Sequence, residues 1–296
     1  MSQQPLVSVI IPTYNREKYI KKALESALNQ TYKNIEIVII NGSPNDETEK
    51  VIKPYLVDSR IKYVHQPEIH TNTVKNRANI AKARNKAIKI SKGKYIAILD
   101  DDDFWSDEKK LEKQVQFLEN HPDYVLCGGG MIIFEENSKT SHIKMLTPEK
   151  DEDIRKSMLF SCPFVHGSVV FRKNIYEKVG GYNEKLYYGH PEDWDLCARL
   201  GRVGKLYNFQ DYFLHCTIRP DTAKGFRRGA FKKAFRIFRL ITKYRNDYPH
   251  FYKSFLYFLV SHIYSIFLFP FQGILKPVVS KIRKRFNNFV GISFSK

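Results

Sequence analysis

The sequence predicts an α/β fold in which helices flank a mostly parallel central sheet, followed by a basic and hydrophobic helical tail at the C-terminus. Short apolar runs rich in β-branched residues alternate with segments whose apolar residues repeat at the spacing of one helix face. Strands that alternate with helices form parallel sheets covered on both sides. With 296 residues, of which 43% are hydrophobic, the chain can bury a sizeable core, and a disordered chain is excluded.

The predicted elements follow one another from the N-terminus. Buried strands are predicted at residues 7–11, 35–40 and 95–99, and a further strand at residues 61–65. Helices are predicted between and after them, at residues 16–30, 48–55 and 79–91. Pro12 closes the first strand, and the Asn-Gly-Ser-Pro sequence that starts at Asn41 closes the second.

Four consecutive acids follow the fourth predicted strand directly: Asp100, Asp101, Asp102 and Asp103. Ligands of parallel sheets bind beyond the carboxyl ends of the strands, so we expect this acidic cluster beside the loops at residues 12–16 and 41–46. Neighbouring carboxylates repel one another, and a hard divalent cation with nucleotide phosphates would remove that cost. The alternative is a solvated turn in which Asp103 or Asp107 caps the next helix.

Five motifs, in this order, resemble the large family 2 of inverting glycosyltransferases. They lie at residues 9–15 (VIIPTYN), 83–85 (ARN), 93–103 (GKYIAILDDDD), 180–184 (GGYNE) and 192–196 (EDWDL). The resemblance covers residues 5–216 and implies the GT-A fold for that part of the chain. It also implies a metal-dependent inverting transfer of a sugar from a nucleotide-sugar, expected to be a UDP-sugar, to a second glycan.

The resemblance implies a role for each matching residue. The residues that would contact the nucleotide-sugar are Pro12, Thr13, Tyr14, Asn15, Asn41, Asp46, Arg84, Asp100 and Asp101. Asn41 stands where the family usually has an Asp that binds the base, and its amide can still accept a hydrogen bond from a uracil N–H. Asn79 stands where a Gly is common, and asparagine tolerates a left-handed backbone.

The remaining implied roles concern the metal, the base and the acceptor. Asp102 would bind Mg²⁺ or Mn²⁺ directly, with His215 as a second ligand. Asp193 would take the proton of the acceptor hydroxyl. The residues expected to face the acceptor are Glu192, Trp194 and His166. The alternative for Asp193 is N-capping of the helix that follows, and for His166 and His215 it is a structural role.

The C-terminal part of the chain is strongly basic, and we predict a tail at residues 217–296 after a domain at residues 1–216. The tail holds 17 Lys and Arg against 2 acids, within a whole-chain net charge of +18. Between residues 226 and 246, cations surround an apolar stripe formed by Phe231, Ala234, Phe235, Phe238 and Ile241. This pattern is typical of a helix that lies in a membrane interface.

The rest of the tail also favours a membrane surface. The apolar stretch at residues 255–271 is shorter than a clean span requires, so we expect an in-plane or re-entrant element. The basic cluster at residues 281–285 suits anionic headgroups. The alternative is a pair of ordinary helices packed on the domain. Nucleic acid is disfavoured as the phosphate partner, because the long apolar stretch suits hydrocarbon better than a groove.

These features predict a peripheral or monotopic protein at the cytoplasmic face of the membrane, active in surface polysaccharide assembly. The expected partners are a nucleotide-sugar donor, a glycan or polyprenyl-linked acceptor and anionic lipid. The four cysteines are widely spaced, which argues against a disulfide framework and a zinc site. A signal peptide is not expected, because the residues before the first strand are short and polar.

Two other functions stay open at this point. A nucleotidyltransferase also carries acids at strand ends, but it would need a Gly-rich phosphate loop after the first strand, and residues 12–15 lack one. A non-catalytic protein that binds membranes or nucleic acid would explain the tail, but it leaves the strand-end acids unexplained.

Overall fold

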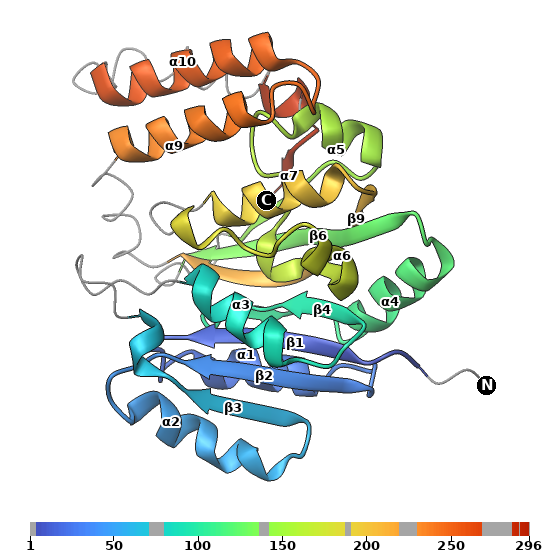
Figure 1. Cartoon of the computed structure of the whole chain (residues 1–296), viewed down its shortest axis with the longest axis vertical. Coiled ribbons are helices and arrows are strands. Elements are labelled where there is room, and N and C mark those ends of the chain that lie inside the picture. The colour runs from blue at the N-terminus through green and yellow to red at the C-terminus, as the bar shows by residue number, and fades with distance from the viewer. Residues whose placement is uncertain are drawn as a thin grey trace.

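The computed structural model describes residues 4–70, 80–135, 142–186, 191–218, 230–267, 286–289 and 291–295, which form a ten-stranded sheet with helices on both faces (Figure 1). The strands are β1 Val7–Thr13, β2 Ile35–Asn41, β3 Ile61–His65, β4 Tyr95–Ile98, β5 Asp103–Trp105, β6 Tyr124–Glu135, β7 His142–Leu146, β8 Val170–Arg172, β9 Lys205–Ile218 and β10 Ser293–Ser295. The helices are α1 Ile20–Leu28, α2 Glu47–Ile52, α3 Ile80–Ile90, α4 Lys110–Asn120, α5 Asp151–Ser157, α6 Lys173–Lys178, α7 Glu192–Gly201, α9 Ala230–Lys243 and α10 Phe251–Phe267.

The sheet has the order β10-β7-β6-β8-β4-β1-β2-β3, and β9 pairs with both β5 and β6. One half is parallel, because β1 pairs with β2 and β4, and β2 pairs with β3, in the same direction. Beyond β4 the pairing through β8, β6 and β7 is antiparallel, although β6 and β9 run parallel. The α/β prediction is confirmed, and the parallel pairing holds for the four strands that were predicted.

Strand β1 shows how this sequence builds two cores. All seven of its residues are buried. Successive side chains of a strand point to opposite faces, so Ile10 joins one core while Val9 and Ile11 join the other. Helices α3 and α7 cover the Ile10 side, and helices α1 and α4 cover the opposite side. Burial on both faces explains why most residues of the strand are apolar.

Two predicted helices are shorter than expected. Helix α1 begins at Ile20, because residues 16–19 form a turn in which the N–H of Tyr19 donates to the carbonyl of Arg16 at 3.0 Å. Helix α2 ends at Ile52, where a 3₁₀ turn with Pro54 in its first positions follows. Proline has no N–H to continue the α-helical ladder. Asn79, at the predicted start of the third helix, lies outside the described residues.

The described part of the tail packs on the body. Leu240 and Tyr244 join the core on the α7 side of the sheet. Helices α9 and α10 lie side by side (Figure 1), and Ala234 and Ile241 of the predicted apolar stripe pack against Phe258. This corrects the prediction for those two residues, which contact α10 instead of a membrane. Among the described helices, none is both long enough and apolar enough to cross a bilayer.

The predicted boundary after residue 216 falls inside an element. Strand β9 continues to Ile218, and β10 near the C-terminus pairs with β7 in the same sheet. The division into a domain and a tail therefore stays a prediction. Residues 226–229 and the basic cluster at residues 281–285 lie outside the described part of the chain.

Candidate active site

The loops that follow β1, β2 and β4 meet at one edge of the sheet. The backbone N–H of Tyr14 donates to Oδ2 of Asp101 at 3.2 Å, which joins the first loop to the acidic cluster. The N–H of Asn15 donates to Oγ of Ser43 at 2.9 Å, which joins the first loop to the second. The predicted meeting of the three loops is confirmed. Pro12 and Thr13 are buried at the end of β1, directly before the first of these loops.

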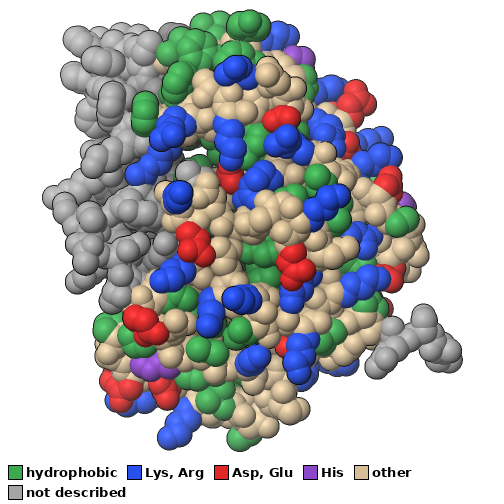
Figure 2. All heavy atoms as spheres, in the orientation of Figure 1, with side chains coloured by type: hydrophobic (Ala, Val, Ile, Leu, Met, Phe, Trp, Pro, Cys, Tyr) green, Lys and Arg blue, Asp and Glu red, His purple; other side chains and the backbone are tan. Residues whose placement is uncertain are grey.

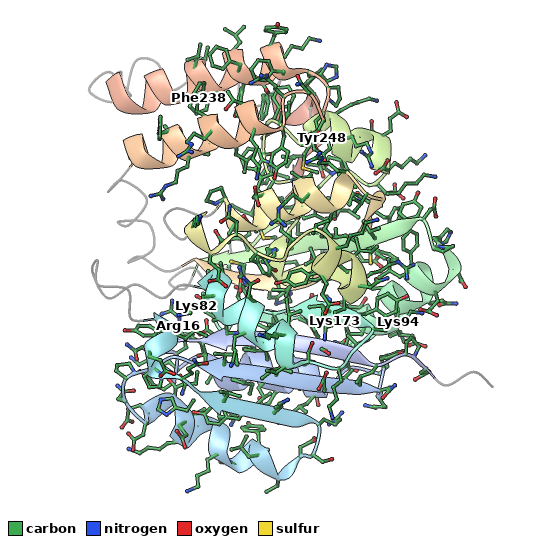
Figure 3. All side chains as sticks on the ribbon, viewed as in Figure 1. Arg16, Lys82, Lys94, Lys173, Phe238 and Tyr248 are labelled. Carbon is green, nitrogen blue, oxygen red and sulfur yellow. The ribbon has the colours of Figure 1, made fainter. Side chains whose placement is uncertain are left out.

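Arg16 brings a positive charge to the acidic cluster. Its Nε lies 3.6 Å from Oδ1 of Asp101, and its Nη2 lies 3.7 Å from Oδ2 of Asp102. Figure 3 shows Arg16 at the edge of the sheet opposite Lys94, which precedes β4. Arg16 is not among the predicted site residues, and its only signal in the sequence is its place directly after Asn15.

The acidic cluster is partly buried and crowded with negative charge. The Asp102 side chain is 26% exposed, and that of Asp101 is less exposed. Burial, followed by the charge of Asp102, raises the pKa of Asp101 to about 7. Burial, followed by the charge of Asp100, raises the pKa of Asp103 to about 8. In the absence of an added cation, the pKa values of Asp101 and Asp103 therefore both lie near neutral pH.

The alternative of a turn that caps the next helix describes this segment only in part, because the N–H of Asp103 donates to the carbonyl of Asp100 at 3.2 Å and closes a turn. Asp103 opens β5 and pairs with β9 opposite Cys216. Helix α4 begins at Lys110, and no side chain caps its N-terminus. Oδ1 of Asp107 accepts a hydrogen bond from the N–H of Lys109 at 2.8 Å and shapes the turn before the helix. The cluster is thus held by sheet pairing on one side and by basic residues on the other.

Arg84, on α3, connects the acidic cluster to α7. Its Nη2 donates to Oδ1 of Asp100 at 2.6 Å, and its Nη1 lies 3.5 Å from Oε1 of Glu192. The side chain is only 3% exposed. Burial alone would lower the pKa of Arg84, but Asp100, Tyr182 and Glu192 raise it above its usual value, so the guanidinium stays charged. The predicted contact of Arg84 with a diphosphate stays a prediction.

Asp193 lies in the first turn of α7, beside the Glu192 that contacts Arg84. The N–H of Trp194 donates to Oδ1 of Asp193 at 2.7 Å. Burial, followed by the charge of Glu192, raises the pKa of Asp193 to about 7. Pro191 occupies the N-cap position and no side chain caps the helix, so the capping alternative for Asp193 is not supported.

The half-buried His166 and the buried Tyr182 form a pair next to Arg84. Nε2 of His166 lies 2.9 Å from Oη of Tyr182, and the Tyr182 ring lies 5.5 Å from the Arg84 guanidinium. Burial, followed by the charge of Arg84, lowers the pKa of His166 to about 3, so this imidazole is neutral. Within the described residues, its buried Nδ1 has no hydrogen-bond partner. Tyr182 is missing from the predicted site, although the Gly-Gly-Tyr motif contains it.

Asn41, which is buried, and Asp46, which is exposed, are the two predicted nucleotide contacts that follow β2. Nδ2 of Asn41 donates to Oη of Tyr63 at 3.0 Å, and its Oδ1 accepts from the N–H of Ser43 at 2.9 Å. Asp46 is exposed and lies 3.1 Å from Nζ of Lys50. Both side chains have structural partners of their own, and their contacts with a nucleotide stay predictions.

Two predicted residues have surroundings that favour a structural role. The Trp194 ring is buried in the core, and its Nε1 donates to the carbonyl of Met158 at 2.7 Å, which leaves no free face for an acceptor. The His215 ring packs against Phe104 and Phe134, with centroids 4.6 Å and 4.7 Å away. In the described part of the chain, no three His, Cys, Asp or Glu side chains gather to hold a metal by themselves. The metal role of His215 stays a prediction.

Comparison with known proteins identifies the family. Residues 8–235 match the sequence profile of Glycosyl transferase family 2. The chain belongs to this family. An uncharacterized glycosyltransferase of Methanocaldococcus jannaschii is 33% identical over 278 residues, which cover 89% of each chain. The predicted glycosyltransferase activity is confirmed, over both the nucleotidyltransferase and the non-catalytic alternative.

Solved structures share the fold of this family 2 enzyme. The mannosyltransferase PcManGT of Pyrobaculum calidifontis, in complex with GDP-Man and Mn²⁺, gives a TM-score of 0.62 at 17% identity over 90% of this chain and 73% of that one. TarS of S. aureus gives a TM-score of 0.59 at 19% identity over 88% and 72%. TarS has also been solved with UDP-GlcNAc. The predicted GT-A fold is confirmed.

Proposed function

We propose that this enzyme moves a sugar from a UDP-sugar to a hydroxyl of a glycan or lipid-linked glycan, in one displacement that inverts the anomeric carbon. The observation that carries the proposal is the bridge that Arg84 forms between Asp100 and Glu192. This bridge brings the acidic loop, where we place the diphosphate, next to the residue before Asp193. Donor and base would then share one site.

Asp193 is the proposed base. In an inverting transfer a base takes the proton of the acceptor hydroxyl as its oxygen attacks the anomeric carbon. A pKa of about 7 suits that step, because such a carboxylate is ionised above neutral pH and is more basic than an exposed one. The charge of Arg84 favours the ionised form and limits the rise caused by burial and Glu192. His166, whose pKa is lowered to about 3 by burial, is neutral in the same site.

The acidic loop suits a divalent cation that is shared with a diphosphate. In nucleotide sites Mg²⁺ is bound by one or two carboxylates together with substrate phosphates, without a cage of protein ligands. Asp102 is the more exposed neighbour of Asp101, whose pKa is raised by burial and then by the charge of Asp102. We assign Asp102 as the carboxylate that holds Mg²⁺ or Mn²⁺. Bound there, the ion would stabilise the negative charge of the leaving diphosphate.

A panel of nucleotide-sugars tests this function. The full chain is incubated with UDP-GlcNAc, UDP-glucose or GDP-mannose, with Mn²⁺ or with EDTA, and the released nucleoside diphosphate is measured. We expect release from UDP-sugars with Mn²⁺ and a loss of that release in EDTA. Full activity in EDTA would contradict the metal role. A preference for GDP-mannose, the donor held by PcManGT, would contradict the expectation that the donor nucleotide is UDP.

The activity should rise with pH through about 7. Asp193 acts as a base only when ionised, and its pKa is raised to about 7, so kcat/KM falls as protons bind below that value and levels off above it. The measurement is donor hydrolysis between pH 5 and pH 9 (on the order of two units either side of the pKa). Asp101 titrates in the same range, so the residual activity of Asp193→Asn provides the control. If kcat/KM of Asp193→Asn still rises with pH through about 7, a group other than Asp193 causes the pH dependence.

We also propose that the enzyme lies on the cytoplasmic face of a membrane through α10 and the exposed side of α9. Figure 2 shows hydrophobic side chains gathered over α10, and Lys and Arg side chains over the adjoining α9. Tyr252 is 84% exposed, and Leu256 and Phe235 are exposed as well. Exposed apolar residues beside cations suit an anionic lipid surface. A lipid-linked acceptor would be presented there.

Vesicle binding tests this location. Leu256→Glu should weaken sedimentation with phosphatidylglycerol vesicles about tenfold, because one leucine side chain would no longer enter the apolar layer. Val57→Glu is the matched control, since Val57 is exposed at the end of the 3₁₀ turn that follows α2, away from the tail. Equal binding by both variants and the wild type would contradict the proposed surface.

A further inference from the structure

Asp195, two residues after the proposed base, lies at the centre of a buried polar cluster. It belongs to the first turn of α7, and only 1% of its surface is exposed. Its Oδ2 accepts a hydrogen bond from Nε of Arg199 at 2.9 Å. Its Oδ1 accepts two more, from Nζ of Lys243 and from Oη of Tyr244, each at 2.7 Å. The cluster therefore ties the helix that carries Asp193 to the end of α9.

Arg199 extends this connection into the active site. Its Nη1 donates to the carbonyl of Val179 at 2.7 Å, just after α6. Val179 precedes the two-glycine turn that leads to Tyr182, whose ring lies 5.5 Å from Arg84. One carboxylate thus links the tail, the helix of the base and the residues around Arg84.

The charge of Asp195 makes this link stiff. Burial alone would raise the pKa of Asp195, but Arg199, Lys243 and Tyr244 lower it below its usual range, so the carboxylate is ionised. Removing one partner of a buried ion pair leaves an uncompensated charge, which is strongly unfavourable. A shift or rotation of the first turn of α7 would therefore break the hydrogen bonds from Lys243 and Tyr244 that stabilise the Asp195 carboxylate.

We propose that Asp195 is a positioning residue, through which the end of α9 sets the place of the Asp193 carboxylate. This inference rests on the proposed role of Asp193 as the base. The two residues belong to one helical turn, so a movement of that turn displaces both side chains together. A base must lie within hydrogen-bond reach of the hydroxyl it deprotonates, and a misplacement of about 1 Å can cost roughly a hundredfold in rate.

Tyr248 offers an internal control for simple packing. Its Oη donates to the carbonyl of Ala198 at 2.6 Å, farther along α7. Tyr248 is buried in the same core as Tyr244, and Figure 3 shows it where the tail meets the body. Loss of either hydroxyl removes a buried hydrogen bond between tail and α7. Of the two, Tyr244 is the one that holds Asp195.

The experiment compares Tyr244→Phe with Tyr248→Phe in the full chain, with Asp193→Asn as the reference for a lost base. Hydrolysis of UDP-GlcNAc, or of the panel donor that the wild type turns over fastest, gives kcat and KM, and thermal unfolding gives Tm. We expect Tm to fall in both Phe variants, and further in Tyr244→Phe, because its hydroxyl binds a buried charge. We expect kcat to fall about tenfold in Tyr244→Phe alone, with an unchanged KM for the donor.

Lys243 provides a second pair of variants. Lys243→Met should lower kcat, and Lys243→Arg, which keeps the charge next to Asp195, should retain most of it. Equal kcat values in Tyr244→Phe and Tyr248→Phe would overturn the inference while leaving the role of Asp193 intact. Wild-type activity in Asp193→Asn would instead overturn the proposed base, and the inference with it.

Discussion

Asp193→Asn is expected to lower kcat about 10²- to 10⁴-fold, the usual range for loss of a general base. The amide keeps the size of the side chain but cannot take the proton of the acceptor hydroxyl. The change should leave the donor KM nearly unaffected, because the Arg84 bridge joins Asp100 to Glu192 and not to Asp193. Steady-state hydrolysis of the nucleotide-sugar measures both constants.

Asp153→Asn is the matched control for this variant. Asp153 is an acid in the first turn of α5, just as Asp193 is in the first turn of α7, but its side chain is exposed and forms a surface ion pair with Lys156 at 3.0 Å. We expect wild-type kcat in this variant. A similar loss of activity in both variants would point to damage to helix ends instead of a missing base.

Asp102→Asn is expected to lower Mn²⁺-stimulated turnover by about 10²-fold or more, because a contact that stabilises charge in the transition state is worth roughly that much. It should also weaken Mn²⁺ binding in the presence of UDP. Calorimetric titration of Mn²⁺ into the enzyme–UDP complex measures the second effect without relying on turnover. Arg16 would then be left with Asp101 as its partner at this edge of the sheet.

Asp123→Asn serves as the control for Asp102→Asn. Asp123 lies just before β6, is exposed, and pairs with Lys205 at 2.9 Å on the surface. Its replacement should change neither turnover nor Mn²⁺ affinity, since surface pairs contribute little. Unchanged Mn²⁺ affinity in Asp102→Asn would move the metal site to another group of the cluster.

The parallel half of the sheet could be predicted because its signals are local. Strands β1, β2 and β4 are short and mostly apolar, and β3 carries Ile61, Tyr63 and Val64. Residues that break regular structure separate these strands from the next helix. Once the strands are parallel, their carboxyl ends share one edge, so the meeting of Tyr14 with Asp101 follows from topology. Which residues at that edge contact the acidic cluster depends on side-chain contacts, which the sequence does not show. Arg16 and Tyr182 were therefore not predicted.

The antiparallel half could not be predicted in the same way. Three consecutive glycines, residues 128–130, resemble a loop in the sequence, yet they lie inside the long strand β6. A Cβ at Gly129 would lie 2.3 Å from Cδ2 of Phe213, so the missing side chain makes room for a ring from β9. The partner lies more than eighty residues away in the chain, and local patterns carry no information about such a contact.

The tail shows a similar ambiguity. An apolar stripe surrounded by cations suits a lipid surface, and it suits a neighbouring helix equally well. Here Ala234 and Ile241 contact Phe258 of α10, while Tyr252 and Leu256 stay exposed. The partners of Asp195, Lys243 and Tyr244, are likewise distant in sequence, so the cluster became visible only in three dimensions.

The pairing of β10 with β7 matters for anyone who wishes to shorten this enzyme. Ser293 pairs with Leu146 and Ser295 with Lys144, so the last strand covers one rim of the sheet. A shortened chain that ends before β10 would present the bare backbone of β7 to solvent, and bare strand rims join to those of other molecules. Trimming the hydrophobic end to gain solubility would therefore invite self-association.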